Sequence, residues 1–276
     1  MFLNSVILIL QETLEAALLI SVLLVFSKLH GIKPLWLFAG ILLGTIGAYI
    51  FAVNMAQISE WFDYVGQEIT NALLQFSILI FIGIFVLSSP KNSDFFTRPI
   101  HQKKDDATTP EQTHWCTGCM LLMVALALTR EGSEVFIYIG GVVSQPSHIQ
   151  PTLAGAGIGD GLGISAGVLI YYALLMLPPQ KIATSGLLLL ALVGGNMASQ
   201  ATLLLTQADW LPYSTTLWDS SELLPENSIL GHLLYALIGY EATPSIIQVI
   251  SYVVGLMLVY VCHFFADTQT IQPNPV

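Results

Sequence analysis

Residues 2–27 read FLNSVILILQETLEAALLISVLLVFS, an apolar run that is interrupted by two acids, Glu12 and Glu15. A helix needs about 20 mostly apolar residues to cross roughly 30 Å of hydrocarbon, so this run is long enough to span a membrane. A charged side chain at the centre of such a helix costs at least about 2.5–3.5 kcal/mol on insertion scales. The run therefore predicts a transmembrane helix whose two acids need a functional explanation.

The whole chain has the composition of a membrane protein. Hydrophobic residues make up 54% of its 276 positions and charged residues only 9%, whereas soluble domains carry roughly 25% charged residues. Apolar runs lie near 2–27, 34–54, 69–89, 116–140, 153–177, 182–205 and 245–266. A transmembrane barrel would show short alternating strands instead, so we expect an all-α integral membrane protein of about seven transmembrane helices. The run 229–239 is too short to span and predicts an interfacial or re-entrant helix.

The basic residues predict the orientation of the chain. Seven of the eight lie between apolar runs: Lys28, Lys33, Lys91, Arg98, Lys103, Lys104 and Lys181. The segments 55–68, 141–152 and 206–244 contain none. The positive-inside rule then places the N-terminus outside and the C-terminus in the cytoplasm. The N-terminus lacks the basic region of a signal peptide, so we expect the first run to stay as a membrane helix.

An internal repeat appears when the sequence is shifted by 119 residues. Glu12 then meets Glu131, Glu15 meets Glu134, and Gly40 meets Gly159. We expect a three-helix repeat at 1–89, a cytoplasmic linker at 90–115, a second repeat at 116–205, an acidic outer loop at 206–244, and a seventh helix with a tail at 245–276. Because three is odd, the second unit enters the membrane from the opposite side. Binding sites in such inverted repeats tend to lie near the midplane, where the units meet.

Small residues follow one face of the second and fifth runs. They recur at spacing four: Gly40, Gly44, Ala48, Ala52 and Ala56, then Gly155, Gly159, Gly163 and Gly167. Small side chains let the backbones of membrane helices approach closely. We interpret both stripes as packing surfaces.

The charged motifs of the two units are Glu12-x-x-Glu15 and Glu131-x-x-Glu134, the second preceded by Arg130. Residues three apart share one face of a helix, so each pair can present two carboxylates to one ion. Carboxylate oxygens suit hard cations. Four ionised glutamates, Arg130 and a ferric ion sum to zero charge, whereas a divalent ion would require one protonated acid. Arg130 would hold the acids ionised and in place when no metal is bound. Glutamates that tie helices together, and a proton relay without metal, stay open as alternatives.

The paired motifs in a chain of about seven helices resemble the high-affinity iron permeases, the oxidase-dependent iron transporters of fungi and bacteria. The segment Leu217-Trp218-Asp219 is similar to the family's loop before the last helix, and Gln67-Glu68 to another acidic family position. Gly239-Tyr240 resembles the approach to that last helix.

The resemblance implies uptake of ferric iron across the bacterial inner membrane, often after an extracytoplasmic partner oxidises ferrous iron. It carries Glu12, Glu15, Glu131 and Glu134 over as metal ligands and Arg130 as the accompanying arginine. Two positions depart from the family pattern. Gln11 stands where the family usually has arginine, and Asn71 stands where a second acid often follows Glu68, which affects the expected metal preference.

Other residues are candidates for the path of the ion. The outer segments carry acids that no lysine or arginine offsets, and a field of one sign concentrates the opposite ion. We expect an entrance at Asp219 and Glu222, and we consider Glu68 and Asp160 as path residues. His114, Cys116 and Cys119 are candidates for an exit site, although a single CxxC is a weak signal. No cysteine lies on the oxidising side, so we expect no disulfide framework.

Three other functions stay open: transport of another hard or divalent metal, a membrane di-iron enzyme, and a proton-coupled carrier of an organic solute. Helical di-iron sites use Glu-x-x-His pairs, and here the pair is Glu111 with His114, in a polar segment. We therefore expect no enzyme, no permanently bound cofactor and iron as cargo. Partners would be lipid and an iron oxidase or delivery protein, with no nucleic acid; a homo-oligomer stays open. Rocking of the units or exchange between successive carboxylates would move the ion.

Overall fold

The computed structural model describes residues 2–89, 110–143, 146–226 and 228–269. Within these ranges the regular structure is helical apart from one isolated bridge, between Thr216 and Ser245. The helices are α1 (Phe2–Leu29), α2 (Leu35–Val53), α3 (Met55–Ser59), α4 (Trp61–Tyr64), α5 (Gly66–Ser88), α7 (Pro110–Val143), α8 (Pro146–Leu175), α9 (Pro179–Gln207), α10 (Ile229–Ile238) and α11 (Ile246–Gln269). The expected all-α fold is confirmed for the part of the chain that is described.

Six helices are long and apolar enough to cross a membrane, judged by length and composition over the described residues. They are Phe2–Leu29, Leu35–Val53, Gly66–Ser88, Ile149–Leu175, Lys181–Gln207 and Ile246–Ala266. The remaining expected span, near 116–140, lies in α7, a helix of 34 residues. α7 is not among the six because Arg130, Glu131 and Glu134 interrupt its apolar sequence. Its charge is therefore the feature that separates α7 from the other long helices.

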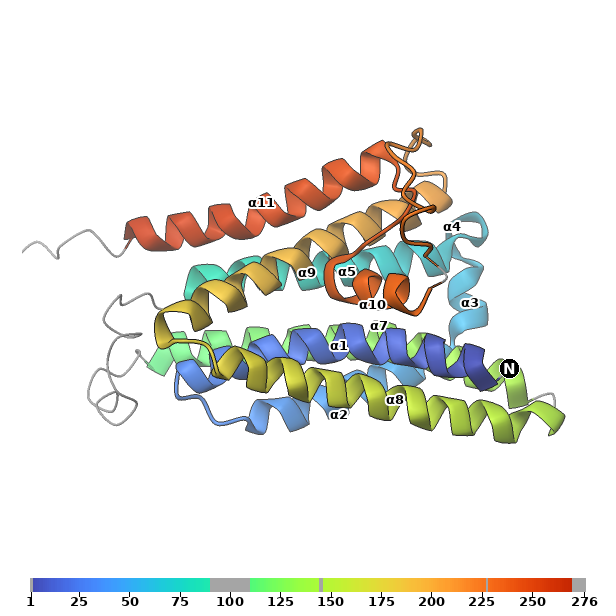
Figure 1. Ribbon diagram of the computed structural model, residues 1–276, viewed down its shortest axis with the longest axis horizontal. Coiled ribbons are helices and arrows are strands. Elements are labelled where there is room, and N and C mark those ends of the chain that lie inside the picture. Colours follow the sequence, from blue (N-terminus) through green and yellow to red (C-terminus); the bar gives the residue numbers. More distant parts are fainter. Residues whose placement is uncertain (1, 90–109, 144–145, 227, 270–276) are drawn as a thin grey trace, which may run out of the picture.

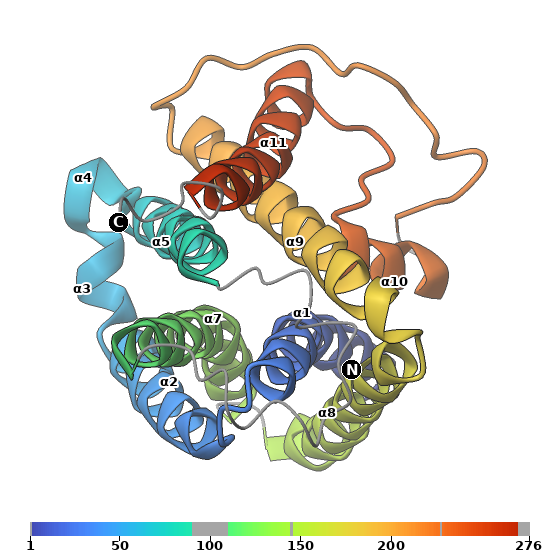
Figure 2. The same cartoon turned by 90° about the vertical axis from the view of Figure 1, so that its left-hand side faces the viewer.

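The long helices form two layers (Figures 1 and 2). In one layer, α1 packs along α8 and α2 packs along α7, while α1 and α7 also contact each other. In the other layer, α9 packs against both α5 and α11. Contacts of α5 with α7 and of α9 with α1 join the layers. The two helices that carry the glutamate pairs, α1 and α7, thus lie side by side in the interior of the bundle.

The small-residue stripes pack as expected, and each packs against a glutamate-bearing helix. A Cβ built at Gly44 of α2 would lie 2.9 Å from the carbonyl oxygen of Ala125 in α7. A Cβ at Gly159 of α8 would lie 2.6 Å from the carbonyl oxygen of Val6 in α1. Side chains larger than hydrogen would therefore push these helix pairs apart. The prediction that the stripes are packing surfaces is confirmed for their glycines, whereas Ala56, which was assigned to the same stripe, lies in α3 and is exposed.

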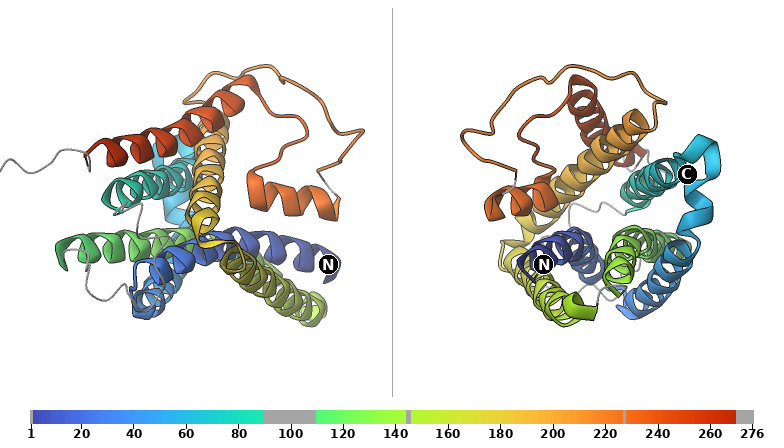
Figure 3. Two further views of the ribbon diagram at one scale, coloured as in Figure 1. Left: turned by 60° about the vertical axis from the view of Figure 1, so that its left-hand side comes forward. Right: turned by 90° about the vertical axis from the view of Figure 1, so that its right-hand side faces the viewer.

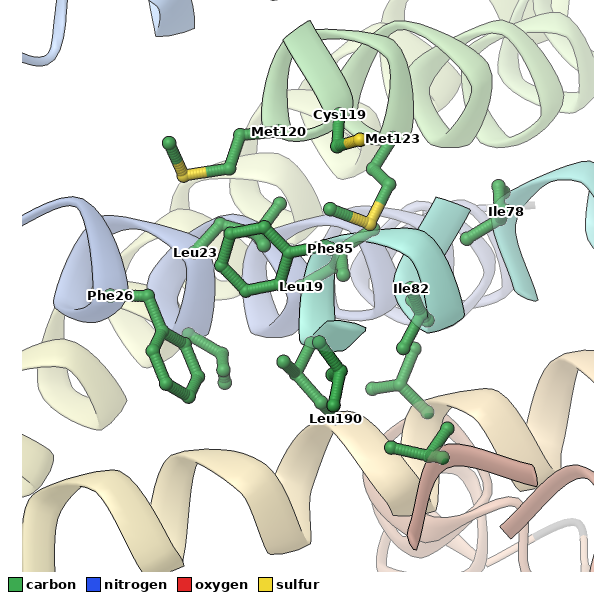
Figure 4. Packing of buried hydrophobic residues seen from close by; sticks show 14 of the residues in the cluster. Leu19, Leu23, Phe26, Ile78, Ile82, Phe85, Cys119, Met120, Met123 and Leu190 are labelled. Carbon is green, nitrogen blue, oxygen red and sulfur yellow. The ribbon is translucent and has the colours of Figure 1, made fainter. Parts of the chain in front are cut away.

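The apolar core lies where α1, α5, α7 and α9 meet. Figure 4 shows Leu19 and Leu23 of α1 packed with Ile82 and Phe85 of α5, beside Met123 of α7. Such fully buried apolar side chains, together with the small-residue contacts, hold membrane helices together by dispersion. The core occupies the half of the bundle beyond the glutamates, toward the α1–α2 turn.

The segment 206–244, which was expected outside the membrane and is called the outer segment below, has its described residues at the end of the bundle where the N-terminus lies, together with α3 and α4 (Figures 1 and 3). The expected short helix of this segment is α10. It begins at Ser228, whose hydroxyl accepts a hydrogen bond from the backbone of Gly231, and it ends at Gly239 in the left-handed conformation with φ of 69°. A glycine adopts this C-terminal conformation without a steric penalty. The α1–α2 and α8–α9 connections lie at the opposite end (Figure 1); Lys28 is in the last turn of α1, Lys33 lies between α1 and α2, and Lys181 is in the first turn of α9.

Candidate metal-transport site

Arg130 occupies the middle of the glutamate cluster. Its Nη1 atom donates to Glu15 Oε2 at 3.1 Å and to Glu131 Oε1 at 2.5 Å, and its Nη2 atom lies 3.8 Å from Glu134 Oε1, one helical turn further along α7. Arg130, Glu15 and Glu131 are each less than a tenth exposed. Because removing one partner of a buried ion pair leaves an uncompensated charge, the cluster requires its arginine. The four expected ligands and Arg130 are thus brought together, as the spacing of the two motifs predicts.

Glu12 completes the cluster from α1. Glu12 is 7% exposed, and its carboxyl group neighbours that of Glu131, with which it interacts electrostatically. One oxygen of each, Glu12 Oε2 and Glu131 Oε2, is buried without a hydrogen-bond partner. Two carboxylates this close repel each other unless a proton or a cation lies between them. These two oxygens therefore leave the site with unused capacity for positive charge.

No group of three or more histidine, cysteine, aspartate or glutamate side chains among the described residues has the geometry of a metal site. The positive charge at the centre is instead the guanidinium of Arg130, which contacts three of the four acids. A planar guanidinium suits carboxylates well because it offers five donors in a rigid fork. A metal ion bound by the same oxygens would have to replace these contacts.

Three buried amides, which the sequence analysis did not identify, extend from Arg130 into α9 and α5. Gln200 Oε1 accepts hydrogen bonds from Arg130 Nη2 and from Gln75 Nε2, each at 2.9 Å. Gln200 Nε2 donates to Asn196 Oδ1 at 3.1 Å. All three side chains are at most 5% exposed. Their one signal in the sequence is the presence of uncharged polar residues inside otherwise apolar runs.

A cavity of about 430 Å³ opens beneath the outer segment. Its lining includes Gln11, the residue before Glu12, and three ionisable groups of the outer segment, Glu226, His232 and Glu241. His232 Nδ1 and Gln11 Oε1 are 3.1 Å apart, so α10 is joined to α1 at this point. Burial raises the pKa of the Glu241 carboxyl, although hydrogen bonds from Gln248 act in the opposite direction. The cavity connects the outer segment with the glutamate-bearing part of α1.

A second cavity, of about 390 Å³, lies between α1, α5, α7 and α9. Glu68, Asn71 and Glu134 contribute to its lining. Glu68 Oε2 and Asn71 Oδ1 are buried without hydrogen-bond partners, and Asn71 is only 3% exposed. Glu68, a candidate path residue, and Glu134 of the central cluster therefore line the same cavity.

The remaining candidate residues lie apart from the cluster. Asp219 and Glu222 are exposed and do not line the outer cavity. Asp219 Oδ1 accepts a hydrogen bond from the backbone of Ser221, which lowers the pKa of Asp219. Asp160 is exposed and accepts a hydrogen bond of 3.2 Å from Thr13 on α1. Their proposed roles stay predictions.

The candidate exit residues do not form one group. His114 is exposed, whereas Cys116 and Cys119 are 2% and 4% exposed and belong to the apolar core. Figure 4 shows Cys119 there. Free cysteine commonly behaves as a small hydrophobic residue in such surroundings. The basic residues at 91, 98, 103 and 104 lie outside the described residues.

Comparisons with known proteins give consistent matches to iron permeases. The model of the iron permease FTR1 family matches residues 2–268. Similar relatives are the ferrous iron permease EfeU of Escherichia coli O6:K15:H31 (strain 536 / UPEC), 24% identical over 246 residues and 87% of each chain, and that of Yersinia pestis, 22% identical over 265 residues, 94% of this chain and 92% of its own. No solved structure matches the chain.

Proposed function

Because this chain belongs to the iron permease FTR1 family, and is thus a multi-pass membrane protein that transports iron rather than an enzyme, we propose that its iron passes between the glutamates of α1 and α7. The observation that carries the proposal is the contact of one guanidinium with Glu15, Glu131 and Glu134. These carboxylates already converge on a cation, and Glu12 lies beside Glu131. An incoming metal ion would take over oxygens that Arg130 now binds.

The two cavities support a path on either side of the cluster. The outer cavity reaches Gln11, next to Glu12, and its lining includes Glu226 and Glu241. The second cavity reaches Glu134 and includes Glu68. Carboxylate oxygens along both cavities would replace water around a hard cation step by step. We propose Glu68 as a path residue, with Glu226 and Glu241 at the entrance beside the expected Asp219 and Glu222.

We also propose seven membrane spans, with α7 as the additional one, and two inverted units within 1–89 and 116–205. The lengths of the helices and the position of α7 between α2, α5 and α1 support the seventh span. The reciprocal packing of α1 on α8 and of α2 on α7 supports the repeat, because the shift by 119 residues exchanges these two pairs. Lys28, Lys33 and Lys181 at one end support an N-terminus outside.

The charge of the cluster favours ferric iron. Four ionised glutamates and Arg130 leave a net charge of −3 that Fe³⁺ would neutralise, whereas Fe²⁺ would require an additional proton. The relatives named above are called ferrous iron permeases, and this favours Fe²⁺ as the second candidate. Uptake that follows oxidation outside the membrane would reconcile the two, with an oxidase or delivery protein as partner.

The test is iron-55 uptake by proteoliposomes that contain wild-type protein or a single variant at each central acid: Glu12→Gln, Glu15→Gln, Glu131→Gln or Glu134→Gln. We expect each variant to lose most of its uptake, because glutamine keeps the size of glutamate and removes its charge. Glu60→Gln, which changes an exposed acid that lines neither cavity, serves as the control. Ascorbate or a ferroxidase added outside separates Fe²⁺ from Fe³⁺, and competition by Mn²⁺ or Zn²⁺ tests other metals. Unimpaired uptake by all four variants would overturn the proposal.

A further inference from the structure

Arg130 is held from two sides. Its Nη1 atom faces the acids Glu15 and Glu131, and its Nη2 atom donates to the neutral amide oxygen of Gln200 at 2.9 Å. Its Nε atom is buried and has no hydrogen-bond partner. The guanidinium therefore lies between a cluster of acids and a cluster of neutral amides. Its Nε–H group can donate one further hydrogen bond.

The neutral side of this boundary is a chain of amides. Gln200 and Asn196 lie one turn apart on α9, and Gln75 reaches them from α5. Gln75 is fully buried, and its Oε1 atom has no hydrogen-bond partner. Burying an amide oxygen without a partner is costly, and the neighbouring positions Ile78, Leu79 and Met197 are apolar core residues. Burying these amides among apolar side chains therefore costs free energy, and a role in binding Arg130, which Gln200 contacts, would explain why they are present.

On the basis of the function proposed above, we propose that Gln200, with Gln75, is a positioning residue that receives Arg130 when iron enters the glutamate cluster. An ion among the carboxylates competes with the guanidinium for the same oxygens and repels it as a like charge. Arg130 cannot leave for water because it is buried. Amide oxygens can accept hydrogen bonds from Arg130, and they attract a metal ion less strongly than carboxylates do. Gln75 Oε1 is buried and has no hydrogen-bond partner of its own.

This arrangement makes affinity for iron depend on a residue that does not contact the ion. Without the amide oxygen, Arg130 keeps its full competition for the carboxylates, so iron binds more weakly. With a carboxylate at position 200, Arg130 is drawn away from the cluster permanently, so iron binds more tightly and leaves more slowly. The two changes therefore shift the KM for iron in opposite directions, which a purely structural residue would not do.

The experiment compares iron-55 uptake kinetics of Gln200→Met, Gln200→Glu and Gln75→Met in proteoliposomes, with equal amounts of protein that is monodisperse in detergent. Loss of a hydrogen bond to a charged group costs about 1.5–3 kcal/mol, so we expect Gln200→Met to raise the KM roughly tenfold or more. Gln75→Met should raise it less, and Gln200→Glu should lower both KM and maximal rate. Thr202→Val, which removes a buried hydroxyl from the same helix, should leave the KM unchanged.

A second measurement tests whether Gln200 acts through Arg130. In an Arg130→Met background, Gln200→Met should change iron affinity no further, because there is no guanidinium left to receive; binding of iron to the purified variants is measured by calorimetry. Additive effects in this cycle, or a wild-type KM in both Gln200→Glu and Gln75→Met, would overturn the inference. If the inference is overturned in this way but Glu131→Gln still loses uptake, the proposed function stands. Normal uptake in all four glutamate variants would overturn both the proposed function and this inference.

Discussion

Substituting Gly159 by alanine tests the closest approach between α1 and α8. The new Cβ would lie 2.6 Å from the carbonyl oxygen of Val6 and 2.9 Å from the backbone nitrogen of Leu10. Both contacts are with backbone, so no side-chain rotation can relieve them. Ordinary contact begins at 3.4 Å, and α8 must therefore withdraw from α1 by up to about 0.8 Å, close to the turn that carries Glu12.

The magnitude follows from a comparison with Gly161→Ala. Gly161 lies on the same helix, and a Cβ there would have nothing within 4 Å. Replacing glycine by alanine in a helix interior favours folding by about 0.8–1.0 kcal/mol, and this gain is common to both variants. Overpacking costs about 1–3 kcal/mol and applies to Gly159→Ala alone. We therefore expect Gly159→Ala to be less stable than Gly161→Ala by about 1–3 kcal/mol.

The assay is thermal unfolding of both variants in the same detergent, followed by iron-55 uptake in proteoliposomes. Gly161→Ala should match or exceed the wild-type melting temperature and retain uptake. Gly159→Ala should melt lower and transport more slowly, because the displaced α1 carries two of the four acids. Identical melting curves and uptake for the two variants would refute the close packing of α1 on α8.

Three further results are expected. Arg130→Leu leaves the buried acids without a counter-charge and should cost about 3–5 kcal/mol of stability, measured by thermal unfolding; recovery of the melting temperature on addition of iron would support the site, and an unchanged melting temperature without iron would contradict it. Burial raises the pKa of Glu241, so acidification neutralises this group at a pH where an ordinary glutamate stays ionised. The KM for iron should therefore rise as pH falls, and Glu241→Gln should lose this part of the pH dependence; identical profiles would count against an entrance there. Joint replacement of Cys116 and Cys119 by alanine should cost about 1 kcal/mol per site and leave iron uptake unchanged, whereas loss of uptake in stably folded protein would support an exit role.

The sequence predicted the features that depend on one-dimensional pattern. Long apolar runs marked the six candidate spans, and the spacing of small residues identified the faces on which α2 and α8 pack. The two motifs identified the acids that meet between α1 and α7, where Arg130 contacts Glu15, Glu131 and Glu134; their role as metal ligands stays a prediction. Each of these features is local to one helix or repeated at a fixed shift, so it leaves a periodic signal in the sequence.

The parts of the site that depend on how helices face one another were not predicted. Gln75 and Gln200 are 125 residues apart, and nothing in either apolar run indicates that they meet beside Arg130. In the outer segment, the resemblance to the family favoured Asp219 and Glu222 among the acids, whereas the outer cavity is lined by Glu226 and Glu241. The difference arises because the segment folds back through hydrogen bonds such as that from the backbone of Ala242 to Glu226.

The reciprocal packing of the helices has a consequence for how the transporter can move. Each tight pair, α1 with α8 and α2 with α7, takes one helix from each proposed half of the chain, so the halves are interlocked and cannot separate as rigid blocks. Any opening must instead separate the pair α1–α8 from the pair α2–α7. The ion pair from Arg130 on α7 to Glu15 on α1 joins these two pairs, so in the proposed mechanism a cation that displaces the arginine also breaks this contact between them.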